Sequence, residues 1–384
     1  MVMATCRFAP IGLVFCFVIF LASCGSLPRT PYSAAEATRP KVLDVSDLRF
    51  FADDPMQALY ALRPRATVNG EITYLALSGG GADGAFGAGV LAGLSDAGAR
   101  PEFSAVSGVS TGALIAPFAF LGPQYDQKLK EFYTGGIASS LAQGGGPLSI
   151  LSTSGPFANY SLKRLVDRYV DGPLLQAIAA ESAKGRRLLV ITTNLDRQQT
   201  NIWNMGKIAE IGTPEALTLF RNVITASASI PVVFPPVLIE AEANGHRFEE
   251  MHVDGGVTSP VLTLPDIFLL RGHRLPGPPI NLYILINNTI DHDFQVVPGS
   301  TSAIAARSAS TLVKMQTRST IFDSYSLTRR NNFKFNLTYV GADFHEEETQ
   351  EFSTSFMRAL YQYGYAKGRS GSAWIHQPPP EALH

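Results

Sequence analysis

The chain has 384 residues, of which 46% are hydrophobic and 16% are charged, and its 31 basic and 32 acidic side chains leave a formal net charge of −1. This balance provides no positive electrostatic potential that would bind a phosphate backbone, so it argues against a nucleic-acid partner. The hydrophobic content excludes an intrinsically disordered chain. Beyond the first 25 residues no apolar stretch reaches the length of about 20 residues that crosses a bilayer. We therefore expect a soluble body with a substantial core.

The N-terminus has the pattern of a targeting segment rather than of a folded element. Arg7 supplies a positive charge, an apolar run covers residues 11–21, and the run Leu21-Ala22-Ser23-Cys24-Gly25 follows directly. This last run resembles the lipobox of bacterial lipoproteins. The resemblance implies that residues 1–23 are a signal peptide and that Cys24 becomes an acylated first residue. An ordinary secretory signal or a single N-terminal anchor remains the alternative.

The other cysteines of the chain support the lipoprotein interpretation. Cys6 and Cys16 both precede the expected cleavage point, so the exported part would hold no disulfide and no thiolate metal site. By resemblance to bacterial sorting patterns, Gly25 after the cysteine favours the outer membrane. We therefore expect a protein of the cell envelope, held by an N-terminal lipid anchor at the outer membrane and facing the periplasm.

Residues 24–70 come next in chain order. Five prolines interrupt any long helical or strand periodicity here, so we predict a tether, with room only for a short helix over 55–62. From residue 71 compact apolar runs alternate with stretches of helical spacing. We predict strands over 72–78, 103–109, 187–193, 201–205, 248–253, 280–286 and 333–340. We predict helices over 85–97, 111–121, 160–170, 214–226, 302–325 and 348–365. This alternation favours a layered α/β fold with a mainly parallel sheet over 71–370, followed by a tail over 371–384.

A glycine cluster follows the first of these strands, with the sequence Gly79-Gly80-Gly81-Ala82-Asp83-Gly84. Glycines let backbone N–H groups point outward with no Cβ in the way, and the helix that follows adds the positive end of its dipole, so the loop suits an anion. The same residues match the dinucleotide fingerprint G-x-G-x-x-G, and a purely structural tight turn would also fit them.

A second motif, Gly108-Val109-Ser110-Thr111-Gly112, matches G-x-S-x-G at the junction of a predicted strand and a predicted helix. In a nucleophile elbow the turn is so sharp that only small residues fit beside the serine, whose hydroxyl is left exposed above the sheet. The glycine cluster begins 31 residues upstream, where its amides could donate to an oxyanion beside Ser110. Ser110 is therefore the candidate nucleophile.

A serine nucleophile needs a base, and none of the seven histidines lies in the late strand-to-loop context of an α/β-hydrolase histidine. The run His252-Val253-Asp254-Gly255-Gly256 stands out instead, because the glycines let the chain turn away and leave the carboxylate uncovered. An aspartate that merely caps a turn has the same pattern. Asp254 is the candidate base.

These motifs, with residues 226–236 (ASASIPVVFPP), resemble in order and spacing the patatin-like phospholipase family over residues 72–368. The resemblance implies a three-layer α/β/α fold and a Ser-Asp dyad that hydrolyses lipid acyl esters through an acyl-enzyme, as a phospholipase A or lysophospholipase. It further implies that no metal or cofactor takes part, and that the partners are a phospholipid or other acyl-ester lipid and a membrane. By this resemblance Ser110 is the nucleophile and Asp254 the base. The amides of Gly79, Gly80 and Gly81 form the oxyanion hole, and the motif glycines are Gly108, Gly112, Gly255 and Gly256.

One residue departs from the family pattern, because Asp83 stands where the family usually has Arg or Lys. A negative charge near a headgroup or an oxyanion is unfavourable, so Asp83 must point away, be neutralised, or mark a different substrate preference. This departure keeps open a catalytically silent lipid-binding lipoprotein with the same fold. A dinucleotide enzyme would leave the Ser110 and Asp254 motifs unexplained. The run Asp291-His292-Asp293 predicts a solvated loop rather than a metal site, since consecutive residues cannot readily converge on one ion.

Overall fold

The computed structural model describes residues 27–54, 57, 63–139, 141, 159–231, 233–264, 277–346, 348, 350 and 352–379. A central sheet has the strand order β1-β5-β4-β3-β2-β8-β9. The strands from β4 to β9 in this order are parallel, namely β4 (Arg187–Asn194), β3 (Ala105–Val109), β2 (Ile72–Leu77), β8 (Ile280–Ile286) and β9 (Lys334–Tyr339). One edge is antiparallel, with β5 (Gln199–Asn204) and β1 (Arg49–Phe51). The hairpin of β6 (Val237–Ala243) and β7 (His246–Asp254) joins the end of β4 through β7.

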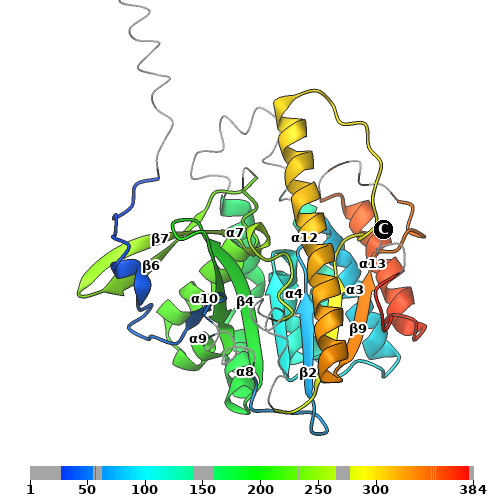
Figure 1. Ribbon diagram of the computed structural model, residues 1–384, viewed down its shortest axis with the longest axis horizontal. Helices are drawn as coiled ribbons and strands as arrows, with labels where there is room; N and C mark the ends of the chain where they lie inside the picture. The colour runs from blue at the N-terminus through cyan, green and yellow to red at the C-terminus, as the bar shows by residue number, and fades with distance from the viewer. Residues whose placement is uncertain are drawn as a thin grey trace, which may run out of the picture.

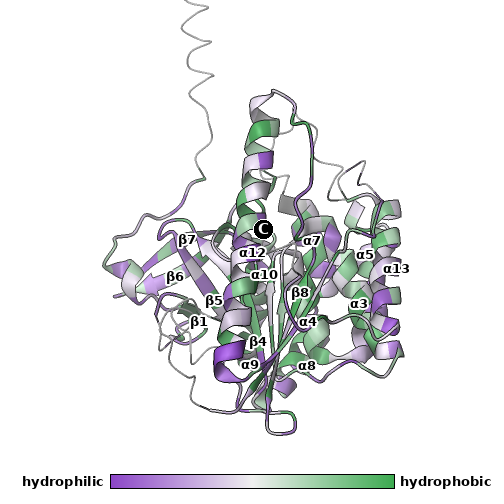
Figure 2. Cartoon of the chain, turned by 45° about the vertical axis from the view of Figure 1, so that its right-hand side comes forward, coloured by the Kyte–Doolittle hydropathy of each residue, from purple (hydrophilic) through white to green (hydrophobic). Residues whose placement is uncertain are grey.

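The parallel strands are buried on both faces, and alternate side chains enter two separate cores. Leu75 and Leu77 of β2 point into one core, whereas Tyr74 and Ala76 point into the other. Helices cover the first face: α3 (Gly84–Asp96), α4 (Thr111–Leu121), α5 (Asp126–Thr134), α7 (Asn159–Tyr169), α8 (Gly172–Ala183), α9 (Met205–Ile211), α10 (Pro214–Ser227) and α13 (Thr354–Arg369). The long helix α12 (Thr301–Asn331) lies over the second face (Figures 1 and 2). The predicted three-layer α/β/α fold with a mainly parallel sheet is confirmed.

Each predicted strand has an observed counterpart, but some element ends differ. The last helix begins at Thr354 rather than at residue 348, because Phe352 has a φ of 55° and its N–H donates to the Glu348 carboxylate at 2.6 Å. That turn cannot continue a helix, so Phe352 leaves the helix face on which it was expected. Of the short helix expected over 55–62, only residue 57 lies within the described residues.

The expected tether over 24–70 does not hold for the part of this segment that the structure describes. Arg29 donates to Asp196 through both terminal guanidinium nitrogens at 2.6 Å, and the Tyr32 ring stacks on Phe248 with centroids 4.3 Å apart. Further along, β1 pairs with β5. Prolines rule out a long helix here, but they allow an extended chain along an antiparallel edge. Cys24 lies outside the described residues.

The C-terminal tail expected over 371–384 also packs on the domain in its described part. Ile375 exchanges backbone hydrogen bonds with Leu337 of β9 at 2.8 and 2.9 Å, and the Trp374 ring meets Tyr283 edge-on. Within the described ranges, no helix combines the length and hydrophobicity that crossing a bilayer demands.

Candidate active site

Ser110 lies in a sharp turn between β3 and α4. Its backbone has φ 55° and ψ −123°, a conformation that non-glycine residues rarely adopt and that marks a nucleophile elbow. A Cβ at Gly108 would collide with the carbonyl group of Gly112, and a Cβ at Gly112 would lie 2.6 Å from the Leu77 carbonyl oxygen. Both glycines of the motif are therefore required by close backbone approach.

The turn at Ser110 is held from α10. The Ser110 N–H donates to Ser227 Oγ at 3.0 Å, and the Ser227 hydroxyl donates to the Ile191 carbonyl of β4 at 2.6 Å. Ser227 is fully buried. It belongs to the segment 226–236, to which the sequence assigns no chemical role, so its role in holding the Ser110 turn emerges only from the fold.

Asp254 ends β7 and is fixed by its backbone beside the same turn. Its N–H donates to the Ser229 carbonyl at 3.0 Å, and its carbonyl accepts the Thr193 hydroxyl at 3.0 Å. Its carboxylate Oδ1 accepts the Gly256 N–H at 2.7 Å. The other oxygen, Oδ2, is buried and has no hydrogen-bond partner among the residues that the structure describes. That oxygen is an acceptor available for chemistry.

Burial raises the pKa of Asp254 to about 7, while the Ser110 hydroxyl and the Gly256 N–H act in the opposite direction. The Ser110 hydroxyl therefore lies close to the Asp254 carboxyl. Catalytic contacts of this kind commonly tighten when substrate binds. A carboxyl with this pKa is a much stronger base than an ordinary aspartate with a pKa of about 3.9.

The glycine cluster runs beside the elbow. A Cβ at Gly79 would lie 3.1 Å from the Ser110 Cβ, and Gly80, at φ 155°, leaves no room for a Cβ against the Asn287 carbonyl. The Gly79 N–H donates to the Pro260 carbonyl at 3.1 Å, so this amide is already engaged. Of the three amides expected to form an oxyanion hole, those of Gly80 and Gly81 have no recorded backbone acceptor among the described residues.

Asn287, the residue after β8, anchors this loop. Its Nδ2 donates to the Ser78 carbonyl at 2.9 Å, its N–H donates to Ser78 Oγ at 2.8 Å, and its Oδ1 accepts the Gly87 N–H at 3.1 Å. The side chain is fully buried. The sequence shows only an asparagine at the end of a predicted strand, which is too common a pattern to reveal this role.

An apolar pocket opens at Ser110. Its walls include Leu114 of α4, Phe132 of α5, Leu162 of α7 and, from later segments, Ile230, Phe234 and Phe352. Ser110 and Asp254 are only 6% and 5% exposed, and Ser110 lines the pocket, so its side chain lies in an apolar recess rather than on an open surface. Such walls suit a hydrocarbon chain.

Asp83 lies in the 3-10 turn Gly81–Asp83 that links the glycine cluster to α3, and it is half-buried. Burial raises the pKa of its carboxyl to about 8, the Glu348 carboxylate raises it further, and Lys314 opposes them. The side chain is therefore mostly protonated at pH 7. Of the three explanations open for this residue, the pKa favours neutralisation.

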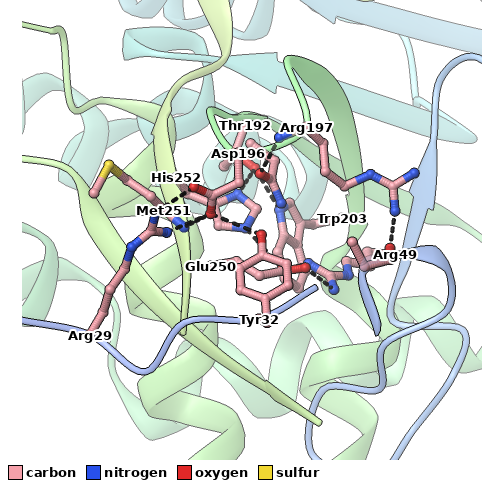
Figure 3. Close-up of polar contacts among 12 residues, drawn as sticks. Arg29, Tyr32, Arg49, Thr192, Asp196, Arg197, Trp203, Glu250, Met251 and His252 are labelled. Atoms are coloured by element: carbon pink, nitrogen blue, oxygen red, sulfur yellow. Dashed lines mark hydrogen bonds and ion pairs between the residues drawn. The ribbon is translucent and has the colours of Figure 1, made fainter. Parts of the chain in front are cut away.

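His252 is engaged elsewhere. Its Nδ1 lies 3.0 Å from Thr192 Oγ1 and its Nε2 lies 3.3 Å from Glu250 Oε2, while burial lowers its pKa. Arg49 of β1 pairs with Glu250 on the same buried cluster (Figure 3). Since both ring nitrogens have partners in this cluster, the imidazole is not placed between Ser110 and Asp254.

The chain matches the model of the patatin-like phospholipase family over residues 75–267, half of its length, including the glycine cluster, Ser110 and Asp254. Three solved structures are similar at low identity. VipD from Legionella pneumophila is 15% identical with a TM-score of 0.38 over 79% of this chain and 67% of that one. Human GIVD cytosolic phospholipase A2 is 12% identical, with a TM-score of 0.32 over 68% and 48%. The type III effector protein ExoU is 14% identical, with a TM-score of 0.28 over 79% and 54%.

The chain thus spans about half the length of the last two proteins. No curated protein matches it. The family model covers the strand, elbow and aspartate segments that form the site described above. The chain belongs to the patatin-like phospholipase family, a family of lipid hydrolases.

Proposed function

We propose that this chain hydrolyses acyl esters of lipids with a Ser110–Asp254 dyad, in the manner of a phospholipase A or lysophospholipase. One observation carries the proposal: a serine in a strained elbow, at an apolar pocket, lies close to a buried carboxyl, one oxygen of which has no hydrogen-bond partner among the described residues. Burial raises the pKa of that carboxyl to about 7, which suits a general base at neutral pH.

In the first half of the reaction, Asp254 Oδ2 accepts the hydroxyl proton of Ser110 while Oγ attacks the ester carbonyl carbon. The carbonyl oxygen becomes negative and receives hydrogen bonds from the Gly80 and Gly81 amides, with the N-terminus of α3 adding its dipole. The intermediate then collapses, the alcohol leaves with the proton returned by Asp254, and the acyl group stays on Ser110.

In the second half, water replaces the alcohol. Asp254 accepts a proton from the water as it attacks the acyl carbonyl, and the same two amides receive the new oxyanion. Collapse releases the carboxylic acid and regenerates the Ser110 hydroxyl with the proton from Asp254. Each oxyanion donor typically contributes about 10² to 10³ in rate, so the glycine cluster matters nearly as much as the base.

The silent lipid-binding alternative depended on the charge of Asp83. With its pKa raised to about 8, this carboxyl is mostly neutral at pH 7 and does not oppose an oxyanion or a phosphate group. The observation that favoured a silent protein therefore loses its force, and the hydrolase is the function that the site supports best.

Release of fatty acid from a defined phospholipid mixture tests the proposal. The purified chain is incubated with phosphatidylcholine, phosphatidylethanolamine, phosphatidylglycerol and their lyso forms, and the products are profiled by mass spectrometry. We expect fatty acid from the parent protein and from Ser370→Ala, an exposed serine after α13, but not from Ser110→Ala or Asp254→Asn. Equal release by Ser110→Ala would contradict the dyad.

We also propose that acylation of Cys24 anchors the chain at the outer membrane, facing the periplasm. The support comes from the sequence at 21–25. Arg29, which is fixed to Asp196, follows five residues later, and five extended residues span about 17 Å, so a lipid on Cys24 would keep the domain at the bilayer. Cys24→Ala should abolish lipid labelling and leave an uncleaved precursor. Persistent labelling would contradict the anchor.

A further inference from the structure

Helix α12 is longer than the sheet that it covers. Its 31 residues extend about 46 Å, whereas the seven residues of β8 extend about 23 Å. Because α12 joins the parallel strands β8 and β9, it starts at the carboxyl edge of the sheet, the edge at which Ser110 and Asp254 lie. Among the described residues of α12, the buried hydrophobic side chains, Ile321 and Leu327, lie in its second half. The N-terminal half overruns the sheet and stands clear of it in Figure 1.

This overrunning end carries an unusual share of the exposed hydrophobic surface. Among the described residues, eleven large hydrophobic side chains are exposed, and six of them lie between residues 294 and 315. Phe294 is 94% and Leu312 is 71% exposed. We call five of these six, Phe294, Val296, Ile304, Leu312 and Met315, the α12 patch; the sixth, Val313, lies on another side of the helix. The last three residues of the patch fall on one side of the helix at 100° per residue.

Ion pairs hold the loop before α12 against the helix. Arg307 and Lys314 each donate to the Asp293 carboxylate at 2.7 Å, and Lys314 also donates to the Asp291 carbonyl at 2.9 Å. Phe294 comes directly after this fixed aspartate. No acidic residue occurs between positions 294 and 322, and the charged side chains from 291 to 318 leave one net positive charge. These ion pairs fix the loop that carries Phe294. The segment around the patch has no excess of negative charge.

The patch is also connected to the candidate active site. Gln316 Nε2 donates to the Thr258 carbonyl at 2.7 Å, and the Thr258 N–H donates to the Gly255 carbonyl at 3.1 Å, in the turn that follows Asp254. Two further exposed hydrophobic residues, Val233 and Val257, lie in the segments that flank the site. The exposed apolar surface thus gathers around the catalytic edge.

We propose that the α12 patch inserts into the interface of a phospholipid bilayer and holds the pocket at Ser110 against the lipid surface. The choice of a bilayer rests on the proposed function, because an acyl chain must pass from the bilayer into the apolar pocket. Clustered exposed apolar side chains mark an interaction surface, whereas scattered ones do not. The net positive charge is compatible with anionic headgroups.

Depth-dependent quenching tests the insertion independently of hydrolysis. Leu312→Trp is made in the full chain carrying Ser110→Ala and mixed with vesicles of phosphatidylcholine and phosphatidylglycerol at 3:1, with or without brominated acyl chains. The control is Lys184→Trp, an exposed position just before β4 and hence at the opposite edge of the sheet. We expect brominated lipid to quench the added emission at position 312 and not at 184. Equal quenching at both positions, or none at 312, overturns the proposal.

A second measurement separates docking from catalysis. The double variant Phe294→Ser with Leu312→Ser should lose about tenfold in hydrolysis of the same vesicles and keep its hydrolysis of a soluble short-chain ester. The control Leu43→Ser, which removes an exposed leucine outside the α12 patch, should keep both its hydrolysis of the vesicles and its hydrolysis of the soluble ester. An equal loss of activity on vesicles and on the soluble ester would show that the patch serves folding instead. A concentration-dependent dimer that the double variant abolishes would show that it binds a second copy of the chain.

Discussion

The backbone N–H of Ser110 and the side-chain hydroxyl of Ser227, 117 residues apart, share a buried hydrogen bond of 3.0 Å. The same hydroxyl donates to the Ile191 carbonyl, so one side chain ties the elbow to both α10 and β4. Since a residue at φ 55° and ψ −123° is strained, its conformation depends on such supports.

Ser227→Ala should therefore weaken both fold and catalysis. The Ser110 N–H would be left buried without a partner, which costs about 1–3 kcal/mol of unfolding free energy, and the elbow would relax. Urea unfolding and ester hydrolysis on one preparation measure both effects. Ser229→Ala is the matched control, because that buried hydroxyl, two residues after the end of α10, donates to the Thr225 carbonyl of the helix and not to the Ser110 turn. If the two variants behave alike, Ser227 is not a support for the nucleophile.

A Ser110–Asp254 dyad predicts that kcat/KM falls on the acidic side of its pH profile, with a single ionisation. Only ionised Asp254 can accept the Ser110 proton, so kcat/KM should rise with pH through an apparent pKa of about 7. A profile that is flat from pH 5 to pH 8 would be inconsistent with this base.

The raised pKa of Asp254 also predicts that the stability of the fold falls as pH rises, whereas kcat/KM rises. Because burial raises the folded-state pKa of Asp254 above its unfolded value of about 3.9, the folded chain holds the proton longer. Its contribution to stability is present below about pH 4 and is lost as pH rises through 7. Asp254→Asn should therefore raise Tm more at pH 8 than at pH 4. Thermal unfolding at the two pH values checks this, and a pH-independent difference would count against the raised pKa.

His252→Ala tests whether a hidden triad exists. The imidazole is bound by Thr192 and Glu250, so its loss should lower stability by about 1–3 kcal/mol and leave much of the turnover in the folded fraction. In contrast, Ser110→Ala and Asp254→Asn should each abolish turnover, and combining them should do no further harm. A folded His252→Ala protein as inactive as Ser110→Ala would make the histidine the base.

Asp83 predicts a substrate effect that appears only at alkaline pH. Its carboxyl ionises around pH 8, so hydrolysis of phosphatidylglycerol relative to phosphatidylcholine should fall between pH 7 and pH 9. Asp83→Asn should remove the fall, and added salt should reduce it. A ratio that does not respond to pH, or that responds equally in both proteins, would show that the charge does not reach the headgroup.

The sequence predicts the parallel sheet well because its strands are compact apolar runs, buried on both faces, and most of them are separated by stretches of helical spacing. It misses β1, which has only three residues, and β6, whose run VLIEAEA mixes alternation with good helix formers. The roles of Ser227 and Asn287 and the engagement of the Gly79 amide depend on groups more than 100 residues away in the chain. Such pairings arise from tertiary contact, which local patterns do not encode.

Labelling by a fluorophosphonate, mapped by peptide mass spectrometry, tests the central claim most directly, because the probe reacts covalently only with an activated serine. The parent protein should carry the label on Ser110, with a labelling rate that rises through pH 7, and Asp254→Asn should slow it strongly. Ser110→Ala should carry none. An unlabelled parent protein that is folded, or a label on another serine, would contradict the assignment of Ser110 as the nucleophile.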